Sequence, residues 1–583
     1  MDNRREDGRV APGVGSSMFR GSDEPHREQK SGMSSVREAK AQKLIGHVVS
    51  LAAYGLVSIV LVDHGVSITR NLSGQGTDPF AFLWFLAWWP HAVGAHLSPL
   101  MTKLVWYPVG VSLPWVTSVP ALSLLFAPLT SVAGAVVTYN VLIIAAPALC
   151  AWFAYLVCMR LTGHFVASLL GGFLFGFSSY EMAQDTAALN LSAAFCVPAL
   201  LLVILHRLDG SWSRGRTVAY AVLLLTLQFY ISIEIFATIF VFGGIAWMFA
   251  YLYAAVRRPL LRRLVIDALV AAPFVIAAAA PFLVPMARTY GLVHLPDAWP
   301  YFYTADLLNL VVPSRGNLLG GPFWPLSHHF NGGVQEQDIY LGLPLLFLIW
   351  HFAREQGARP HGRLLIACFL VFLLCSFGPR LWIAGHYTVI GMPWMLAVHL
   401  PLLNNALPAR FALFVSLTAA IIAALWIARP EENRTRLALG LVCCVTLLPG
   451  AHPWRPIPHS AFFAPGRVEA LLGANPRILI LPFAINGPSG YWQMENDYGF
   501  TQTGGYLGFP PAPMQGYKAV GQMFGNDVQP DFVPEFVRFC RATRTQYVVV
   551  GPGANPVMVK AIATLDWPVR KTDDVTIFTV PSP

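Results

Sequence analysis

One acid at the start of an apolar, aromatic stretch is the first residue whose chemistry stands out in this sequence. Asp78 lies in GQGTDPFAFLW (74–84), directly before Pro79. An acid followed by proline is typical of a helix start, so this carboxylate can act as an N-cap. The same carboxylate could act as a general base if a hydroxyl group lies within hydrogen-bonding distance. The two roles are compatible, and both stay open.

Three further acids lie next to apolar runs. Glu181 and Asp185 belong to SSYEMAQDTAALN, and Glu234 lies between two apolar runs with almost no loop around it. An ionisable group in hydrocarbon costs about 2.5–3.5 kcal/mol on insertion scales, so such residues are typical of functional sites or buried pairs. Glu181 and Asp185 could also simply hydrate a short loop. We predict that all three acids contribute to substrate binding.

Two arginines in the long loops are candidates for binding an anion. A planar guanidinium group suits a phosphate or pyrophosphate, and we predict this role for Arg315 and Arg410, although each could instead pair with nearby acids. The adjacent His328 and His329 do not converge as metal ligands on one helix face do, so we predict no metal site there. The sequence has no nucleotide-binding loop, nucleophile elbow or zinc motif.

The composition shows which elements must position these residues. Of 583 residues, 55% are hydrophobic and only 12% are charged, whereas a soluble domain has roughly 25% charged residues. A lipid bilayer is the simplest solvent for such a chain. The net charge of +9 comes from basic residues scattered through short loops, which indicates membrane topology and no nucleic-acid partner.

Eleven apolar runs predict about eleven transmembrane helices. They lie near 44–62, 136–158, 165–180, 193–206, 217–233, 235–253, 265–285, 340–353, 363–378, 411–428 and 435–449. If the N-terminus is cytoplasmic, the basic loops fall on the inner side, as the positive-inside rule requires. A further run at 118–132 is broken by two prolines, and counting it as a crossing would invert every later loop.

This topology divides the chain into three parts. Residues 1–43 are rich in Arg, Glu, Ser and Gly and predict a disordered cytoplasmic tail. Residues 44–449 form the membrane domain, with large outer loops at 63–135, 286–339 and 379–410, and residues 450–583 lie outside. Within the first loop, the segment from Asp78 to His96 predicts a helix that lies in the membrane interface.

The C-terminal part has the pattern of a small α/β domain. Short strand-like runs alternate with two helical patterns, and the strands are expected at 477–483, 545–552 and 575–581. Between Ala484 and Asn526 lies a stretch rich in Gly, Pro, Tyr and Gln. Loops of this length are usually functional.

The order of these parts resembles the GT-C superfamily of membrane glycosyltransferases. The resemblance is carried by GQGTDPFAFLW at 74–84, TYNVLIIAAPALCAWFAYLVCMRLTG at 138–163, GGFLFGFSSY at 171–180 and LPLLNNALPARF at 400–411. It implies a polytopic α-helical membrane protein with a GT-C-like fold and a C-terminal extracytoplasmic α/β domain. It also implies a place in the cell envelope, in the inner (plasma) membrane.

The resemblance also implies a reaction. A sugar on a polyprenyl-phosphate carrier would pass to a lipid, glycan or protein acceptor on the outer face of the membrane. Asp78 would activate the acceptor hydroxyl, and Arg315 and Arg410 would stabilise the leaving phosphate. The first loop has no Asp-X-Asp pair, which leaves the use of a divalent metal ion open, and Asp63 could take the place of Asp78.

Two other functions stay open at this stage. A transporter or flippase for lipid-linked saccharides would favour charges in the middle of helices and small outer loops, and this chain has the reverse pattern. A non-catalytic scaffold would use the C-terminal domain to bind a partner.

Overall fold

The computed structural model describes residues 24–292, 296, 298–400, 403–430 and 433–581. The chain forms two compact units, Met1–Val49 and Ser50–Pro583. Helix α1 (Glu24–Ser58) begins in the first unit and ends in the second.

The predicted disordered tail falls partly on residues 1–23, which lie outside the described residues. Its remainder belongs to α1, so the helix begins at Glu24 and not at residue 44. This segment is rich in Glu, Gln, Lys and Arg, which are good helix formers, and it can propagate from the apolar helix that follows it.

Seven helical segments in the described part of the chain are long and apolar enough to cross a membrane, so this is a multi-pass membrane protein. They are Ala41–Asp63, Ala127–Thr162, Phe165–Gln184, Leu189–Leu208, Ile233–Tyr253, Ala255–Arg288 and Pro408–Ile427. The other four predicted runs are also helical, but α14, α15 and α17 are shorter and α9 carries two arginines. Eleven crossings therefore stay a prediction.

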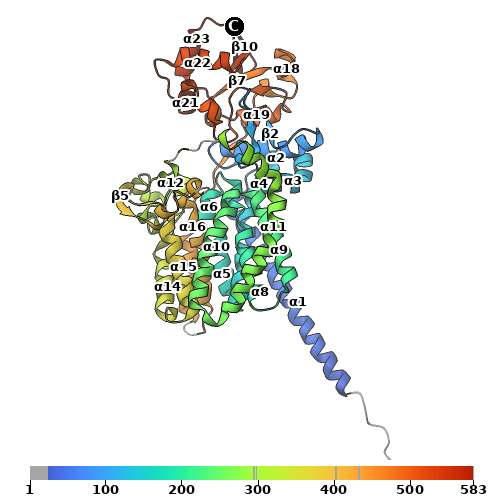
Figure 1. Ribbon diagram of the computed structural model, residues 1–583, viewed down its shortest axis with the longest axis vertical. Coiled ribbons are helices and arrows are strands. Elements are labelled where there is room, and N and C mark those ends of the chain that lie inside the picture. The colour runs from blue at the N-terminus through green and yellow to red at the C-terminus, as the bar shows by residue number, and fades with distance from the viewer. Residues whose placement is uncertain (1–23, 293–295, 297, 401–402, 431–432, 582–583) are drawn as a thin grey trace, which may run out of the picture. The chain divides into compact units, whose positions relative to one another are not determined.

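The helical bundle is drawn in Figure 1. Its helices are α4 (Ala127–Thr162), α5 (Phe165–Gly176), α6 (Ser179–Gln184), α7 (Leu189–Ser192), α8 (Cys196–Leu208), α9 (Arg214–Ile231), α10 (Ile233–Tyr253), α11 (Arg258–Arg288), α14 (Gly342–Gln356), α15 (Pro360–Ser376), α16 (Ala412–Ile427) and α17 (Asn433–Thr446). The loop between α11 and α14 holds the short α12 (Trp299–Phe302) and α13 (Trp324–Ser327).

The proline-broken run at 118–132 is not a separate crossing segment. It forms the short α3 (Pro120–Leu125) and the first turns of α4. Gly134 interrupts α4 with φ 85° and ψ 163°. Residues with a side chain rarely adopt that conformation, so a glycine allows the bend.

Two glycines one turn apart let α4 and α5 approach closely. A Cβ atom on Gly172 would lie 2.6 Å from the carbonyl oxygen of Ala151, and one on Gly176 would lie 2.4 Å from the Ala151 nitrogen. Small residues with this spacing let helix backbones pack together in membranes, where the hydrophobic effect does not drive helices together.

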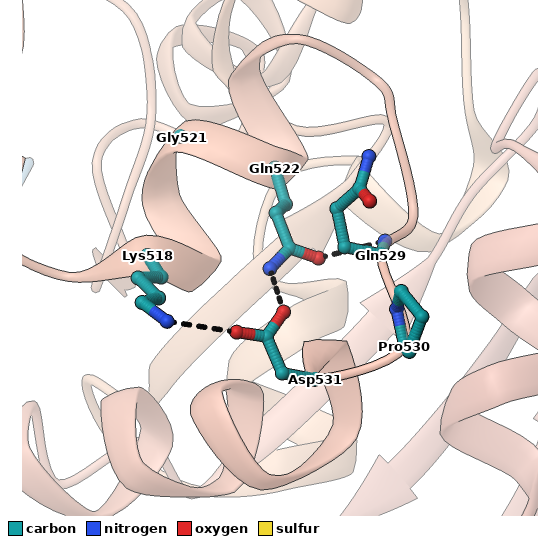
Figure 2. A pocket seen from close by; sticks show the side chains of 6 residues that line it. All are labelled: Lys518, Gly521, Gln522, Gln529, Pro530 and Asp531. Atoms are coloured by element: carbon teal, nitrogen blue, oxygen red, sulfur yellow. Dashed lines mark hydrogen bonds and ion pairs between the residues drawn. The ribbon is translucent and has the colours of Figure 1, made fainter.

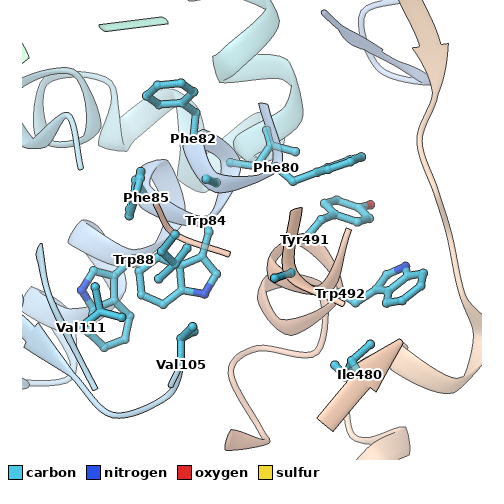
Figure 3. Close-up of a cluster of buried hydrophobic side chains, with 14 of the residues drawn as sticks. Phe80, Phe82, Trp84, Phe85, Trp88, Val105, Val111, Ile480, Tyr491 and Trp492 are labelled. Carbon is cyan, nitrogen blue, oxygen red and sulfur yellow. The ribbon is translucent and has the colours of Figure 1, made fainter. Parts of the chain in front are cut away.

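The aromatic helix α2 (Asp78–Gly94), in the loop 63–135, is buried by protein on most sides. Trp84 and Trp88 are almost completely inaccessible and stack with ring centroids 4.9 Å apart. Figure 3 shows this helix packing its aromatic side chains beside Tyr491 and Trp492 of the C-terminal domain. The prediction of a helix lying in the membrane interface was therefore wrong, because protein covers all three tryptophans. Trp84 and Trp88 pack against Tyr498 of the C-terminal domain, and Trp89 stacks on Phe282 of α11.

The C-terminal domain is built on a five-stranded mixed sheet with the strand order β10-β11-β9-β7-β8. Strand β7 pairs in parallel with β8 and β9, and the remaining pairs are antiparallel. The strands are β7 (Arg477–Leu481), β8 (Thr501–Gln502), β9 (Tyr547–Val550), β10 (Val569–Thr572) and β11 (Val575–Thr579). The helices are α18 (Arg467–Leu472), α19 (Ser489–Glu495), α20 (Ala512–Gln515), α21 (Lys518–Phe524), α22 (Phe532–Ala542) and α23 (Pro556–Ala563).

Three small antiparallel strand pairs lie outside this sheet. Strand β1 (Asn71–Ser73) of the first outer loop pairs with β6 (Trp454–Pro456), which leads into the C-terminal domain. The other two pairs are β2 (Met101–Thr102) with β3 (Val111–Ser112), and β4 (Arg380–Ile383) with β5 (His386–Gly391). The β1–β6 pair therefore joins the two parts of the chain by backbone hydrogen bonds.

Ion pairs join loops that the sequence assigns to the same side of the membrane. Arg160 pairs with Asp209 of the next inner loop. Glu355 accepts hydrogen bonds from Arg429 at 2.7 Å and from Arg436 at 3.0 Å. These contacts agree with the predicted alternation of loops.

We expect Gly176→Ala to lower the free energy of unfolding by about 1–3 kcal/mol, because the added methyl group meets the backbone of α4 and forces the two helices apart. Thermal unfolding of the purified protein in detergent measures the change. Gly244→Ala is the matched control, since nothing lies within 4 Å of its Cβ position. Equal melting temperatures for the two variants would contradict the close packing of α4 and α5.

Candidate functional site

Asp78 is the first residue of α2, and a tyrosine of the C-terminal domain contacts it. Its carboxylate Oδ1 accepts a hydrogen bond from Tyr506 Oη at 2.6 Å. Burial raises the pKa of Asp78, while the hydrogen bond from Tyr506 and the charge of Arg410 lower it. Burial and the neighbouring carboxylate raise the pKa of Tyr506 well above its usual value, so the phenol keeps its proton and donates it.

Arg410 joins acids from two other segments. It lies in the turn Pro408–Phe411, at the start of the last long apolar segment. Its guanidinium group forms an ion pair with Glu234, at the start of α10, and lies 3.6 Å from Glu336 Oε1 in the loop 286–339. One cation thus serves two carboxylates, and the charges of Asp78 and Arg410 interact.

A second contact joins the loop 286–339 to α6. Gln184 Nε2 donates to Asp338 Oδ2 and to the carbonyl oxygen of Gln335, both at 3.1 Å. Burial raises the pKa of Asp338 and of Glu336. The loop therefore presents Glu336 to Arg410 from a fixed position.

Glu181 and Asp185 lie on or next to α6 and are completely buried. Cys150 lies beside Glu181 and Ser192 lies beside Asp185, and neither acid is among the groups that act on the charge of Asp78. The structure therefore does not bring these two predicted site residues to the Asp78 carboxylate.

Beside Asp185 lies a buried row of side chains in the order Ser-His-Asp. His452 Nε2 shares a hydrogen bond with Ser73 Oγ at 2.7 Å, and its Nδ1 lies 3.9 Å from Asp185 Oδ2. Burial lowers the pKa of His452 to about 3, so its ring is neutral. The Ser73 amide already donates to Asn140 Oδ1. We assign this row to the joint between β1 and β6. The three side chains are buried, and the Ser73 amide already has a hydrogen-bond acceptor in Asn140.

Arg315 lies apart from Arg410. Its exposed guanidinium group is 5.4 Å from the centre of the Trp324 ring, and no ion pair is found for it in the described chain. Another arginine, not predicted from the sequence, lies over the first turn of α2. The guanidinium group of Arg455 lies 4.3 Å above the ring of Phe80, and its Nε and Nη2 atoms are buried without a partner among the described residues.

No sequence motif marks Tyr506 or Arg455. The only signal for Tyr506 was the unusual length of the Gly-rich and Tyr-rich loop around it. Arg455 had no signal, because a lone arginine in a connecting segment has no periodicity or motif.

No set of three or more His, Cys, Asp or Glu side chains in the described chain is arranged to hold a metal ion. His328 Nδ1 forms a hydrogen bond with the carbonyl oxygen of Trp324 at 2.7 Å. A hollow with a volume of about 590 Å³ lies on the C-terminal domain. Figure 2 shows that Asp531 there already binds Lys518 and Gln522, so the charged groups of this hollow satisfy one another.

The profile of a family described as "Domain of unknown function (DUF6311)" matches residues 44–448. The chain belongs to this family. The match includes Asp78, Glu234, Glu336 and Arg410, whereas Tyr506 lies outside it. A comparison with curated proteins found no match.

Solved structures show the fold of this DUF6311 member. The arabinofuranosyltransferase AftD from Mycobacteria matches with a TM-score of 0.58 and 13% sequence identity, over 92% of this chain and 40% of AftD. The chain thus spans less than half the length of AftD. At this level of identity the likeness shows the fold alone, so the chain shares the fold of the matching part of AftD.

Two further structures are similar at lower TM-scores. The oligosaccharyltransferase of Archaeoglobus fulgidus has a TM-score of 0.49 and 12% identity, over 89% of this chain and 70% of that enzyme. ArnT from Cupriavidus metallidurans, bound to undecaprenyl phosphate, has a TM-score of 0.44 and 11% identity, over 92% of this chain and 98% of ArnT.

We expect Arg410→Gln to destabilise the protein, because it leaves Glu234 and Glu336 without their cation. The loss should be about 3 kcal/mol, the lower end of the range for broken buried pairs, since 24% of the Arg410 side chain is exposed. Arg315→Gln is the control and should cost no more than about 1 kcal/mol, because an exposed cation–π contact is weak. Denaturant unfolding of both variants measures the difference, and equal losses would contradict the ion-pair cluster.

Proposed function

We propose that this protein is a membrane glycosyltransferase, which moves a sugar from a polyprenyl-phosphate-linked donor to a lipid, glycan or protein acceptor. The observation that carries the proposal is the Asp78 carboxylate, held at the start of α2 by Tyr506 in a chain with the GT-C fold.

The proposed chemistry is a displacement at the anomeric carbon of the sugar. Asp78 accepts the proton of the acceptor hydroxyl, and the hydroxyl oxygen forms the new glycosidic bond. The bond from the anomeric carbon to the carrier phosphate breaks, and its electron pair leaves with the phosphate. Positioned general bases of this kind typically contribute about 10²–10⁴-fold in rate.

The arginines divide between two proposed roles. Arg410 is committed to Glu234 and Glu336, so we assign these three residues to holding the site together. Arg315 and Arg455 have no carboxylate partner within the described residues, and we propose them as contacts for the carrier phosphate. Glu181 and Asp185, being fully buried, are proposed to shape α6 beneath the substrate.

The proposed orientation follows from the loops. The N-terminus lies in the cytoplasm, eleven segments cross the inner (plasma) membrane, and the C-terminal α/β domain lies outside the cell membrane. Support comes from the basic inner loops and from the ion pairs between loops assigned to the same side. This orientation places Asp78, Arg410 and Tyr506 together on the outer face.

The first test compares glycans and glycolipids by mass spectrometry in cells with the wild-type protein, a deletion, Asp78→Asn or Asp566→Asn, at matched membrane expression. We expect the deletion and Asp78→Asn to lose the same sugar mass, because an amide cannot accept the proton. Asp566→Asn is the matched control on an exposed turn of the C-terminal domain and should leave the glycans unchanged.

Two outcomes would contradict the proposal. A glycan that changes on deletion but not in Asp78→Asn would favour transport of the saccharide or another base. Unchanged glycans in the deletion strain would favour a scaffold.

The transfer rate should fall at acidic pH. Asp78 must be ionised to accept a proton, and burial raises its pKa. The rate should therefore decrease as pH falls through a midpoint above the ordinary range for a carboxyl group. Initial rates in membrane vesicles measure this profile, with the glycan identified by mass spectrometry as the product. A rate that stays constant down to pH about 4 would contradict the role of Asp78.

A further inference from the structure

The C-terminal domain holds α2 along its aromatic face. Trp84 Nε1 donates to Gln493 Oε1 at 3.0 Å, and Tyr498 Oη donates to the Trp84 carbonyl oxygen at 3.4 Å. The rings of Phe80 and Tyr491 lie 6.1 Å apart. Figure 3 shows Phe80 and Trp84 of α2 in one buried cluster with Tyr491 and Trp492 of α19.

The contact continues to the first residues of α2. The hydroxyl group of Thr77, the residue before Asp78, donates to the carbonyl oxygen of Ile485. Asp78 itself accepts from Tyr506. The C-terminal domain therefore contacts the backbone and the side chains on both sides of the point where α2 begins.

Tyr506 has a fixed position because the loop that carries it packs against the loop 63–135. Gly505 and Gly508 have φ angles of 108° and 119°, a conformation that favours glycine. The Trp106 amide in the first outer loop donates to the carbonyl oxygen of Gly504 at 3.1 Å. A Cβ on Gly505 would lie 2.9 Å from Val105 Cγ1, so the loop lies directly on that segment.

We propose that Tyr506 is a positioning residue for Asp78, and that the C-terminal domain thereby completes the catalytic site of the membrane domain. This inference rests on the proposed function. Tyr506 holds Oδ1 of the carboxylate, and no other hydrogen bond to the carboxylate is found among the described residues. The second oxygen is then free to take the proton of an acceptor hydroxyl.

The charges around Asp78 make this role measurable. Tyr506 from the C-terminal loop and Arg410 from the last long segment stabilise the ionised carboxylate. Glu336 and Tyr303 of the outer loop 286–339 also face it, as does Tyr139 of α4. Since a hydrogen bond to the charged form lowers the pKa of a carboxyl group, removal of the Tyr506 hydroxyl should raise the pKa of Asp78.

The experiment is an infrared pH titration of the full-length protein in lipid nanodiscs. The carboxyl band of Asp78 is assigned as the band that Asp78→Asn removes. We expect Tyr506→Phe to move the midpoint of this band upward by about one pH unit or more, as is typical for the loss of a hydrogen bond to a charged group. Tyr498→Phe removes a hydroxyl that bonds to α2 but not to Asp78, and should leave the midpoint unchanged.

An unchanged midpoint in Tyr506→Phe would overturn the proposal. An equal shift in both variants would also overturn it, because it would show a general loosening of the domain contact. The titration needs no substrate, so it separates this inference from the transferase function. If the midpoint shifts while glycans are unaffected by Asp78→Asn, the pairing stands and the proposed function fails.

Discussion

The shared ion pair of Arg410 with Glu234 and Glu336 is the interaction on which the rest of the candidate site depends. Three segments of the bundle bring charged groups to one place, and without the guanidinium group two of them would present unmatched carboxylates next to apolar helices. Such charges are costly to bury unless they are paired. The ion pair therefore joins the loop 286–339 and the start of α10 at Arg410, and the charge of Arg410 also lowers the pKa of Asp78.

The second constraint is the interface between the bundle and the C-terminal domain. Helix α2 would expose a large aromatic surface if the C-terminal domain did not cover it. Strand β6 extends this interface by pairing with β1. The catalytic carboxylate of the proposed reaction thus lies between two parts of the chain, and its geometry depends on both. The DUF6311 match ends at residue 448, so the residues that match the family supply the acid but not its tyrosine partner.

The sequence predicted well those structural features that depend only on residues close together in the chain. The apolar runs are helices, and α2 begins at the Asp-Pro pair, because apolar composition and helix-start chemistry act within a few residues. The contacts of the site could not be predicted this way. Tyr506 and Asp78 are 428 positions apart, and Arg410 and Glu234 are 176 apart, so neither pair leaves a periodic signal. The tryptophans of α2 also fit either a lipid interface or a protein interface, and only the fold distinguishes these.

If the proposed function holds, a lipid-linked donor binds beside Asp78 and Tyr506, with its phosphate on Arg315 or Arg455. Electron cryo-microscopy of the full-length protein in nanodiscs with added polyprenyl phosphate tests it most directly. The account predicts density for the phosphate at the same end of the bundle as Asp78, in contact with Arg315 or Arg455, with Tyr506 still bonded to Asp78. Phosphate density at the opposite end, beside Arg429 and Arg436, would contradict the account.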